Sequence, residues 1–178
     1  MSLDRATAPD PIDILPVRPS FKVTSTDILD GAPLPARHVH RTVGGQDVSP
    51  QLSWSGFPAQ TRSFAVTLFD PDTPSECGFW HWVLIDLPAT THELPSGAGT
   101  PGLLPEGAIH TRNDFGNNRY DGSAPSAGDV AHRYVFMVHA LDVETLDVPP
   151  SATGAMVSFN LAFHILARGV IRSTYQVI

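Results

Sequence analysis

Prolines and glycines break this chain into short segments. There are 17 prolines and 14 glycines among 178 residues. Proline lacks the amide donor that helices and sheets require, and both residue types favour turns. Short apolar segments separated by such residues are typical of strands joined by turns. The candidate strands are residues 21–24, 52–54, 63–69, 81–87 and 133–141.

Two of these segments are apolar almost without interruption. Residues 64–69 are Phe-Ala-Val-Thr-Leu-Phe, and residues 82–85 are Trp-Val-Leu-Ile. A strand with one wet face alternates apolar and polar side chains, whereas a strand covered on both faces does not. We therefore expect these two strands at the centre of a sheet.

The periodicity changes near the C-terminus. Between residue 151 and about Gly169, apolar side chains recur at intervals of three and four residues, which is typical of an amphipathic helix. Gly169 is the expected end of this helix, and residues 170–175 are the expected last short strand. The apolar positions that define the stripe are Met156, Phe159, Phe163, Leu166 and Val170.

Composition narrows the class of protein. The chain is long enough for one domain with a substantial core. We expect an arm over residues 1–20, which carry four prolines, and a single domain over residues 21–178. No apolar run reaches the length of a transmembrane helix and no export signal is evident, so a soluble cytoplasmic protein is expected.

Cys77 is the only cysteine, which excludes an internal disulfide. The net charge of -7 without a basic cluster argues against a nucleic-acid partner.

Acids and imidazoles lie where the central strands begin or end. Asp70 follows the strand 63–69, and His81 opens the next strand. If these strands pair antiparallel, both side chains lie at the same edge of the sheet, and His132 joins them if its strand is also antiparallel to 63–69. A carboxylate beside an imidazole raises the pKa of the imidazole and favours a cation. The sequence therefore predicts a small pocket at this rim that holds a phosphate or a carboxylate.

Further groups are expected to complete an anion site. The turn Gly122-Ser123-Ala124 offers backbone amides, and Tyr134 or Tyr120 offers a hydroxyl donor. Other interpretations stay open: Asp70 and Asp72 around Pro71 are also typical of a simple turn, and the histidines are also compatible with structural roles. A metal site of His81, His132 and Asp70 is a further alternative.

Several motifs together resemble the phosphatidylethanolamine-binding protein family, in its bacterial Raf-kinase-inhibitor-like branch. The resemblance covers roughly residues 20 to 176, and the combination is more specific than any single motif. The motifs are Ser49-Pro50-Gln51-Leu52-Ser53-Trp54, Asp70-Pro71-Asp72-Thr73-Pro74, Gly78-Phe79-Trp80-His81-Trp82, Asn113-Asp114-Phe115-Gly116, Tyr120-Asp121-Gly122, Gly128-Asp129-Val130-Ala131-His132-Arg133-Tyr134 and Thr174-Tyr175.

The resemblance implies a mostly β fold, with a large central antiparallel sheet packed on a smaller sheet and a helix near the C-terminus. It also implies a rim pocket that takes phosphate, acetate or a phospholipid head group. The residues that would carry this pocket are Asp70, Asp72, His81, Pro125, His132 and Tyr134. Two positions depart from the family pattern. Ala124-Pro125-Ser126 stands where Gly-Pro-Pro is frequent, and Gln46-Asp47 where Asn is frequent.

We therefore expect a non-enzymatic protein, without a cofactor or a metal, that captures a small anion or a phosphorylated head group and modulates a protein partner. One alternative is a hydrolase that uses the same Asp and His side chains. Another is a protein-interaction module, similar to a kinase inhibitor, that acts through the loops 97–112 and 116–130. A cis peptide bond is expected at Thr73-Pro74. A homodimer is also expected, because Phe79, Trp80, Leu103, Leu104 and Ile109 form an apolar group in the loops.

Overall fold

The two apolar segments form neighbouring strands at the centre of a sheet. A computed structural model describes residues 5–178. In it, β3 (Ser63–Asp70) and β4 (Phe79–Pro88) pair antiparallel within a five-stranded sheet of order β6-β4-β3-β7-β8. A second sheet has the order β1-β2-β5. The other strands are β1 (Lys22–Thr24), β2 (Leu52–Ser55), β5 (Glu93–Leu94), β6 (Ile109–His110), β7 (His132–Leu141) and β8 (Ile165–Tyr175).

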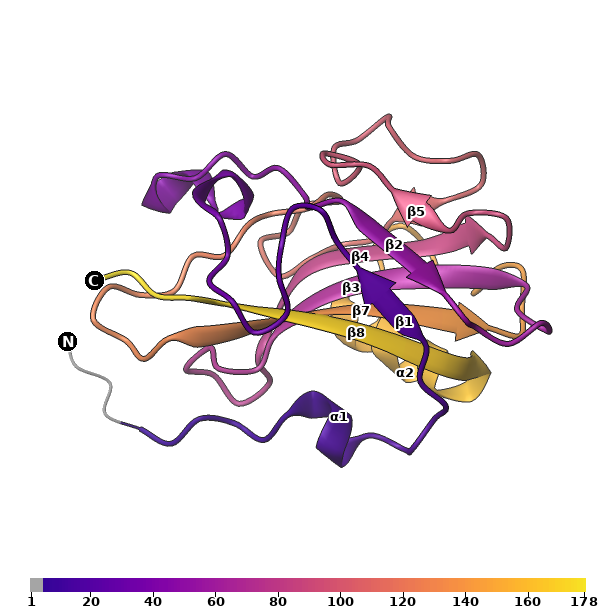
Figure 1. Ribbon diagram of the computed structural model, residues 1–178, viewed down its shortest axis with the longest axis horizontal. Helices are drawn as coiled ribbons and strands as arrows, with labels where there is room; N and C mark the ends of the chain where they lie inside the picture. The colour runs from indigo at the N-terminus through magenta and orange to yellow at the C-terminus, as the bar shows by residue number, and fades with distance from the viewer. Residues whose placement is uncertain (1–4) are drawn as a thin grey trace.

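Both faces of the large sheet are covered, as the uninterrupted apolar runs predict. The small sheet packs on one face around a core that includes Leu52, Phe64, Trp82 and Phe136. On the other face, helix α2 (Gly154–His164) packs through Val157 and Leu161. Figure 1 shows β1 and β2 in front of the large sheet and α2 behind it. This mostly β architecture, with its two antiparallel sheets and its C-terminal helix, confirms the predicted fold class.

The C-terminal helix differs from the prediction in its end and its buried face. It ends at His164, and Gly169 lies inside β8. A Cβ at Gly169 would lie 2.4 Å from the Val23 side chain. Glycine is therefore needed here because the two sheets approach closely, and it does not end the helix. Phe159 of the predicted stripe is 67% exposed, because Gly154, Val157 and Leu161 form the buried face.

The part of the arm from Asp10 to Ser20 runs along the β8 edge of the large sheet. Its residues 11–14 form a single helical turn, α1 (Pro11–Ile14), which begins at Asp10. Asp10 also forms an ion pair with Arg172 of β8 at 2.9 Å, and Ser20 bridges to Arg168. The arm lies below β8 in Figure 1. Within residues 5–178, no helix combines the length and the apolar character that a membrane crossing requires.

Candidate functional site

A β-bulge gives His81 its direction. Leu68 pairs with Trp82 and Phe69 pairs with Trp80, so His81 is the extra residue on β4. Bulges re-aim a side chain because they interrupt the alternation of a strand. Without the bulge, His81 would point to the opposite face from Trp82. With it, both lie on the face that also carries Asp70.

Antiparallel pairing brings the ends of three strands together. Asp70 ends β3, His132 begins β7, and His81 lies near the start of β4 between them. All three line one pocket of about 130 Å³, together with Pro125. The other lining residues are Thr73, Pro74, Phe79, Phe115, Ala124 and Ser126. We call this site the rim pocket. The predicted convergence of Asp70, His81 and His132 on one cavity is confirmed.

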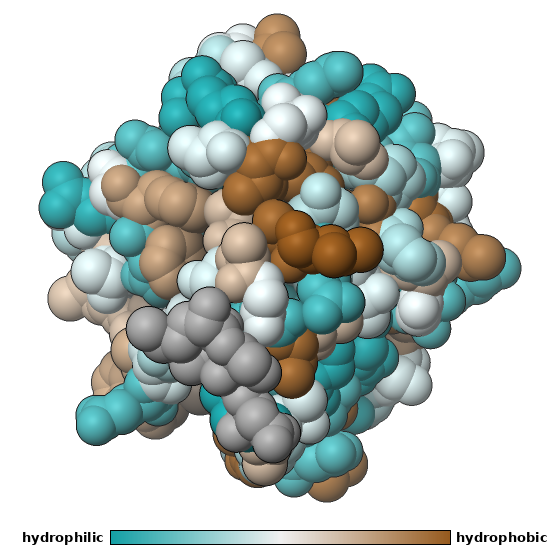
Figure 2. Space-filling view, turned by 90° about the vertical axis from the view of Figure 1, so that its left-hand side faces the viewer, coloured by the Kyte–Doolittle hydropathy of each residue, from teal (hydrophilic) through white to brown (hydrophobic). Residues whose placement is uncertain are grey.

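The rim pocket lies at the end of the large sheet where β3 ends and β7 begins. Its walls combine aromatic rings with short side chains, and the ring of Phe79 lies 4.8 Å from that of Phe115. The loop 121–131 and the turn 70–78 close it from two sides, since they connect to β7 and β4. The space-filling view of this end shows apolar surface surrounded by hydrophilic side chains (Figure 2).

His132 is held between two carboxylates. Its Nδ1 lies 2.7 Å from Asp70 Oδ2, and its Nε2 lies 3.1 Å from Asp129 Oδ2. Burial alone would lower the pKa of His132, but the hydrogen bonds and charges of the two acids outweigh it and raise the pKa. Arg5 donates to Asp129, so these four side chains carry no net charge when His132 is protonated.

His81 has the opposite character. Its Nδ1 lies 3.1 and 3.0 Å from the carbonyl oxygens of Asp121 and Gly122. A carbonyl only accepts, so Nδ1 carries the proton, and the neutral ring leaves Nε2 as an acceptor toward the pocket. Burial lowers the pKa of His81, although the charge of Asp70 opposes this. The pKa values of the two imidazoles are therefore shifted in opposite directions, that of His132 toward the charged form and that of His81 toward the neutral form.

Tyr134 and Asp72 lie behind the pocket. The Tyr134 ring meets the His81 ring edge-on at 5.3 Å and stacks near the His132 ring at 6.5 Å. Burial raises the pKa of Tyr134, so its hydroxyl stays protonated. Asp72 is fully buried against Arg133, with Arg133 Nη2 2.7 Å from its Oδ1. Burial alone would raise the pKa of Asp72, but hydrogen bonds from Arg133 lower it.

The turn after β3 differs from the prediction at Thr73-Pro74. Every peptide bond in the described part of the chain is trans. Asp70 Oδ1 accepts from the amides of Asp72 and Thr73 at 2.8 and 3.1 Å, which reverses the chain without a cis bond. Asp70 therefore has both of the roles considered from the sequence: it shapes the turn, and it pairs with His132 in the pocket.

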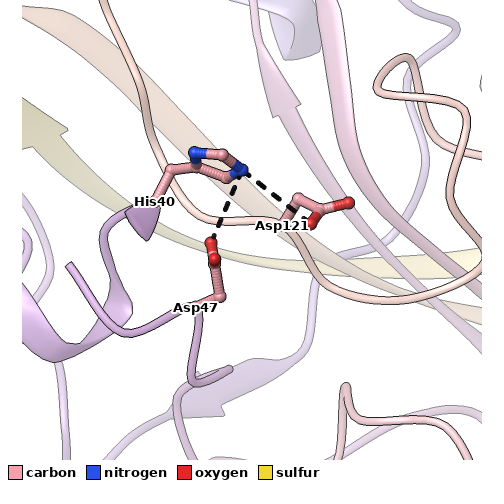
Figure 3. A group of neighbouring side chains, drawn as sticks. All are labelled: His40, Asp47 and Asp121. Carbon is pink, nitrogen blue, oxygen red and sulfur yellow. Dashed lines mark ion pairs between the residues drawn. The ribbon is translucent and has the colours of Figure 1, made fainter. Parts of the chain in front are cut away.

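One group of metal-ligand type lies beside the pocket. His40 Nε2 is 4.0 Å from one oxygen of Asp47 and 4.0 Å from one of Asp121 (Figure 3). Among residues 5–178, these three side chains have ligand atoms close enough together to hold a metal ion. Asp70, His81 and His132, the metal site considered from the sequence, do not. Arg41 pairs with Asp47 at 2.6 Å and Arg119 with Asp121 at 2.9 Å, so the two acids are already compensated.

This group fixes the loop that receives His81. Asp47 Oδ1 accepts from the amide of Gly122 at 2.9 Å, and Asn113 Nδ2 donates to Asp121 Oδ2 at 2.7 Å. Asp47, which departs from the family pattern, uses its second oxygen for Arg41. The His40 ring stacks on Phe115, a wall of the pocket, at 4.8 Å. The sequence did not indicate these supporting roles, nor that of Asp129, although Asp129 precedes His132 by three residues.

Comparison with known proteins agrees with the fold. The model of the phosphatidylethanolamine-binding protein family matches residues 24–176. YbhB of Escherichia coli, a UPF0098 protein, is 50% identical over 160 residues, which cover 88% of this chain and all of YbhB. The crystal structure of Escherichia coli YbcL, described as a new member of the mammalian PEBP family, aligns with a TM-score of 0.86 at 40% identity, over 89% of this chain and 99% of YbcL. A phosphatidylethanolamine-binding protein from Plasmodium vivax, at 15% identity, shares the fold with a TM-score of 0.62, over 94% of this chain and 90% of that protein. This chain belongs to the phosphatidylethanolamine-binding protein family.

Proposed function

We propose that this protein is a non-enzymatic binding protein that holds a small anion, or the phosphorylated head group of a larger ligand, in the rim pocket. The observation that carries the proposal is the pairing of a cationic His132 with a neutral His81 on one pocket of about 130 Å³. The names of the family and of its Plasmodium member refer to phosphatidylethanolamine, a lipid with a phosphorylated head group.

The two histidines have different roles in this proposal. Both ring nitrogens of His132 are engaged by carboxylates, so this residue contributes positive charge and not a free donor. His81 Nε2 accepts the O–H of a monoprotonated phosphate, or takes up a proton and donates to the phosphate oxygen. Pro125 and Phe115 exclude water from the anion, which strengthens both interactions.

A hydrolase would need a hydroxyl, a thiol or a water activated by a base. In the rim pocket, both ring nitrogens of His132 are engaged by carboxylates, and Asp70 Oδ2 is engaged by His132 Nδ1 and by the hydroxyl of Thr73. These three groups are committed to one another, which supports binding over hydrolysis. Modulation of a protein partner in the cytoplasm is part of the same proposal, with the loops around the pocket as the contact surface.

Calorimetric titration with inorganic phosphate and with phosphoethanolamine tests the proposal. Both compounds should bind, and ethanolamine, which lacks the phosphate, should not. His81→Ala and His132→Ala should each weaken binding by roughly 1.5–3 kcal/mol, His81→Ala because it removes a hydrogen bond to a charged group and His132→Ala because it removes a positive charge. His164→Ala is the matched control, because His164 is an exposed histidine that pairs with Asp142 away from the pocket. Unchanged affinity in both pocket variants would place the anion elsewhere.

A further inference from the structure

A second cavity lies on the face of the large sheet that α2 covers. It has a volume of about 190 Å³ and lies between the arm, α2 and strands β7 and β8. Its apolar walls are formed by Pro11, Leu15, Phe69, Met137, Leu161 and Ile165. We call it the arm cavity. It shares no lining residue with the rim pocket.

A buried guanidinium lines this apolar cavity. Arg168 is only 8% exposed, and its Nε is buried without a hydrogen-bond partner among residues 5–178. Its neighbour across the strands is His139, whose Nε2 contacts Thr67 Oγ1 at 3.1 Å, while its Nδ1 is buried without a partner in the same described range. Buried polar groups are normally paired, so two unpaired groups on one cavity indicate a site for a polar ligand atom.

The other charges around the cavity favour an anion. Arg18 also lines it, and its positive charge adds to the burial that lowers the pKa of Arg168. Asp10 is paired with Arg172, and Asp13 borders a neighbouring hollow that Arg18 and Arg168 also line, but it forms no ion pair with either arginine. His139 is neutral, because burial lowers its pKa to about 3. The two arginines therefore form a positive end on an otherwise apolar cavity.

We propose that the arm cavity binds a monocarboxylate with a small aryl or short alkyl body, its carboxylate against Arg168 and its body between α2 and the sheet. A guanidinium and a carboxylate match in geometry and form two parallel hydrogen bonds. The volume fits the apolar body, since a cavity of about 150 Å³ accommodates benzene. This site is additional to the anion pocket at the rim.

Titration of the whole protein with phenylacetate tests this site, with phenylacetamide as the uncharged match of the same shape. Phenylacetate should bind at least about tenfold more tightly than the amide, because only the acid pairs with the guanidinium. Arg168→Gln should weaken phenylacetate by a similar factor. Ala162→Phe, which fills the cavity from α2 and leaves Arg168 in place, should also abolish binding. Arg62→Gln is the control, because Arg62 is exposed and pairs with Glu144.

The location of the ligand separates this site from the rim pocket. Methyl resonances of Met137 and Ile165 should shift on titration, and that of Ala124 should not. His132→Ala should leave phenylacetate binding unchanged, and saturating inorganic phosphate should not compete. Equal affinity for acid and amide, undiminished binding in Arg168→Gln, shifts confined to Ala124, or no binding up to about 10 mM would each overturn the proposal.

Discussion

His132 Nδ1 lies 2.7 Å from Asp70 Oδ2, across the boundary between the start of β7 and the end of β3. Both side chains are buried, so solvent screens the pair weakly. The pair joins β3 and β7 at the point where the rim pocket begins. It links the stability of the sheet to the protonation state of the site.

The first prediction concerns this link. Because the folded protein raises the pKa of His132 above its usual 6.5, the charged pair contributes its full stability below that value. The contribution is lost as pH rises through the folded pKa. The difference in free energy of unfolding between the natural protein and His132→Gln should therefore be largest in mild acid and shrink in mild alkali. Urea unfolding at a series of pH values measures it, and an unchanging difference would contradict the assignment.

A direct titration checks the cause of that shift. Nuclear magnetic resonance of the His132 ring should show a pKa above 6.5 in the natural protein and a lower one in Asp70→Asn, since the amide removes the negative charge that favours the imidazolium. His164 provides the internal reference, because it lies outside the pocket. A His132 pKa that does not respond to Asp70→Asn would mean that Asp129 alone sets it.

The next prediction is that phosphate binding takes up protons. Burial keeps His81 neutral near pH 7, so an anion that binds its Nε2 does so with a proton. Phosphate affinity should rise as pH falls from 8 to 6. Calorimetry at pH 7 in buffers of different ionisation enthalpy should show proton uptake, and His81→Gln should reduce it. If uptake is the same in His81→Gln, the proton goes to another group.

A prediction on packing concerns Gly169. A Cβ there would lie 2.4 Å from Val23 and 2.8 Å from the Phe21 ring, where β8 passes under the small sheet. Gly169→Ala should lower the free energy of unfolding by roughly 1–3 kcal/mol, the usual cost of overpacking. Lys22→Ala, on the exposed part of β1, should stay within about 0.5 kcal/mol. Equal stability of all three proteins would show that the sheets separate easily at this point.

Gly169 also shows where sequence reasoning reached its limit. The uninterrupted apolar runs correctly identified β3 and β4, because a strand buried on both faces has few other sequence patterns. Apolar residues at intervals of three and four can mark either face of a helix. The spacing therefore placed Phe159 and Phe163 on the buried face, although both are exposed. A glycine after such a run is typical of a helix end, and its tertiary role depends on Val23, which is distant in the sequence.

The candidate site, like the fold, was predicted only in part from the sequence. The ends of antiparallel strands meet, so Asp70 and His81 could be placed together from topology, and His132 could join them on the condition that its strand is also antiparallel to β3. The bulge at His81 and the second carboxylate, Asp129, could not, because register shifts and loop paths depend on packing across the whole sheet. Asp72 follows Asp70 by two residues and pairs instead with Arg133, since the turn directs the two carboxylates apart.

Homodimer formation stays a prediction, but the structure favours a different interface from the one expected from the sequence. Of the five side chains expected in the interface, Leu103 is exposed, whereas Phe79 lines the rim pocket and the remaining three pack against the core clusters. The exposed apolar face of α2, with Met156, Phe159 and Phe163, is now the surface whose burial would favour association. Light scattering at micromolar concentration should give about twice the monomer mass of 19.2 kDa, and Phe159→Glu should return the monomer. The monomer mass in the natural protein would contradict this prediction.

The last prediction separates stability from ligand binding at the arm cavity. A buried charge without a partner costs solvation energy that no contact returns, so its replacement by an apolar side chain of similar shape should stabilise the folded protein. Arg168→Met should therefore raise the melting temperature of the ligand-free protein, even though it removes the group proposed to hold a carboxylate. The matched change Arg133→Met should do the opposite, because Arg133 neutralises the buried Asp72 through contacts of 2.7 Å and its loss leaves that carboxylate unpaired. Thermal unfolding of the two variants measures both effects. A loss of stability in Arg168→Met comparable to that in Arg133→Met would mean that the Arg168 guanidinium is compensated within the folded chain, which would also remove the main argument for an anion beside it.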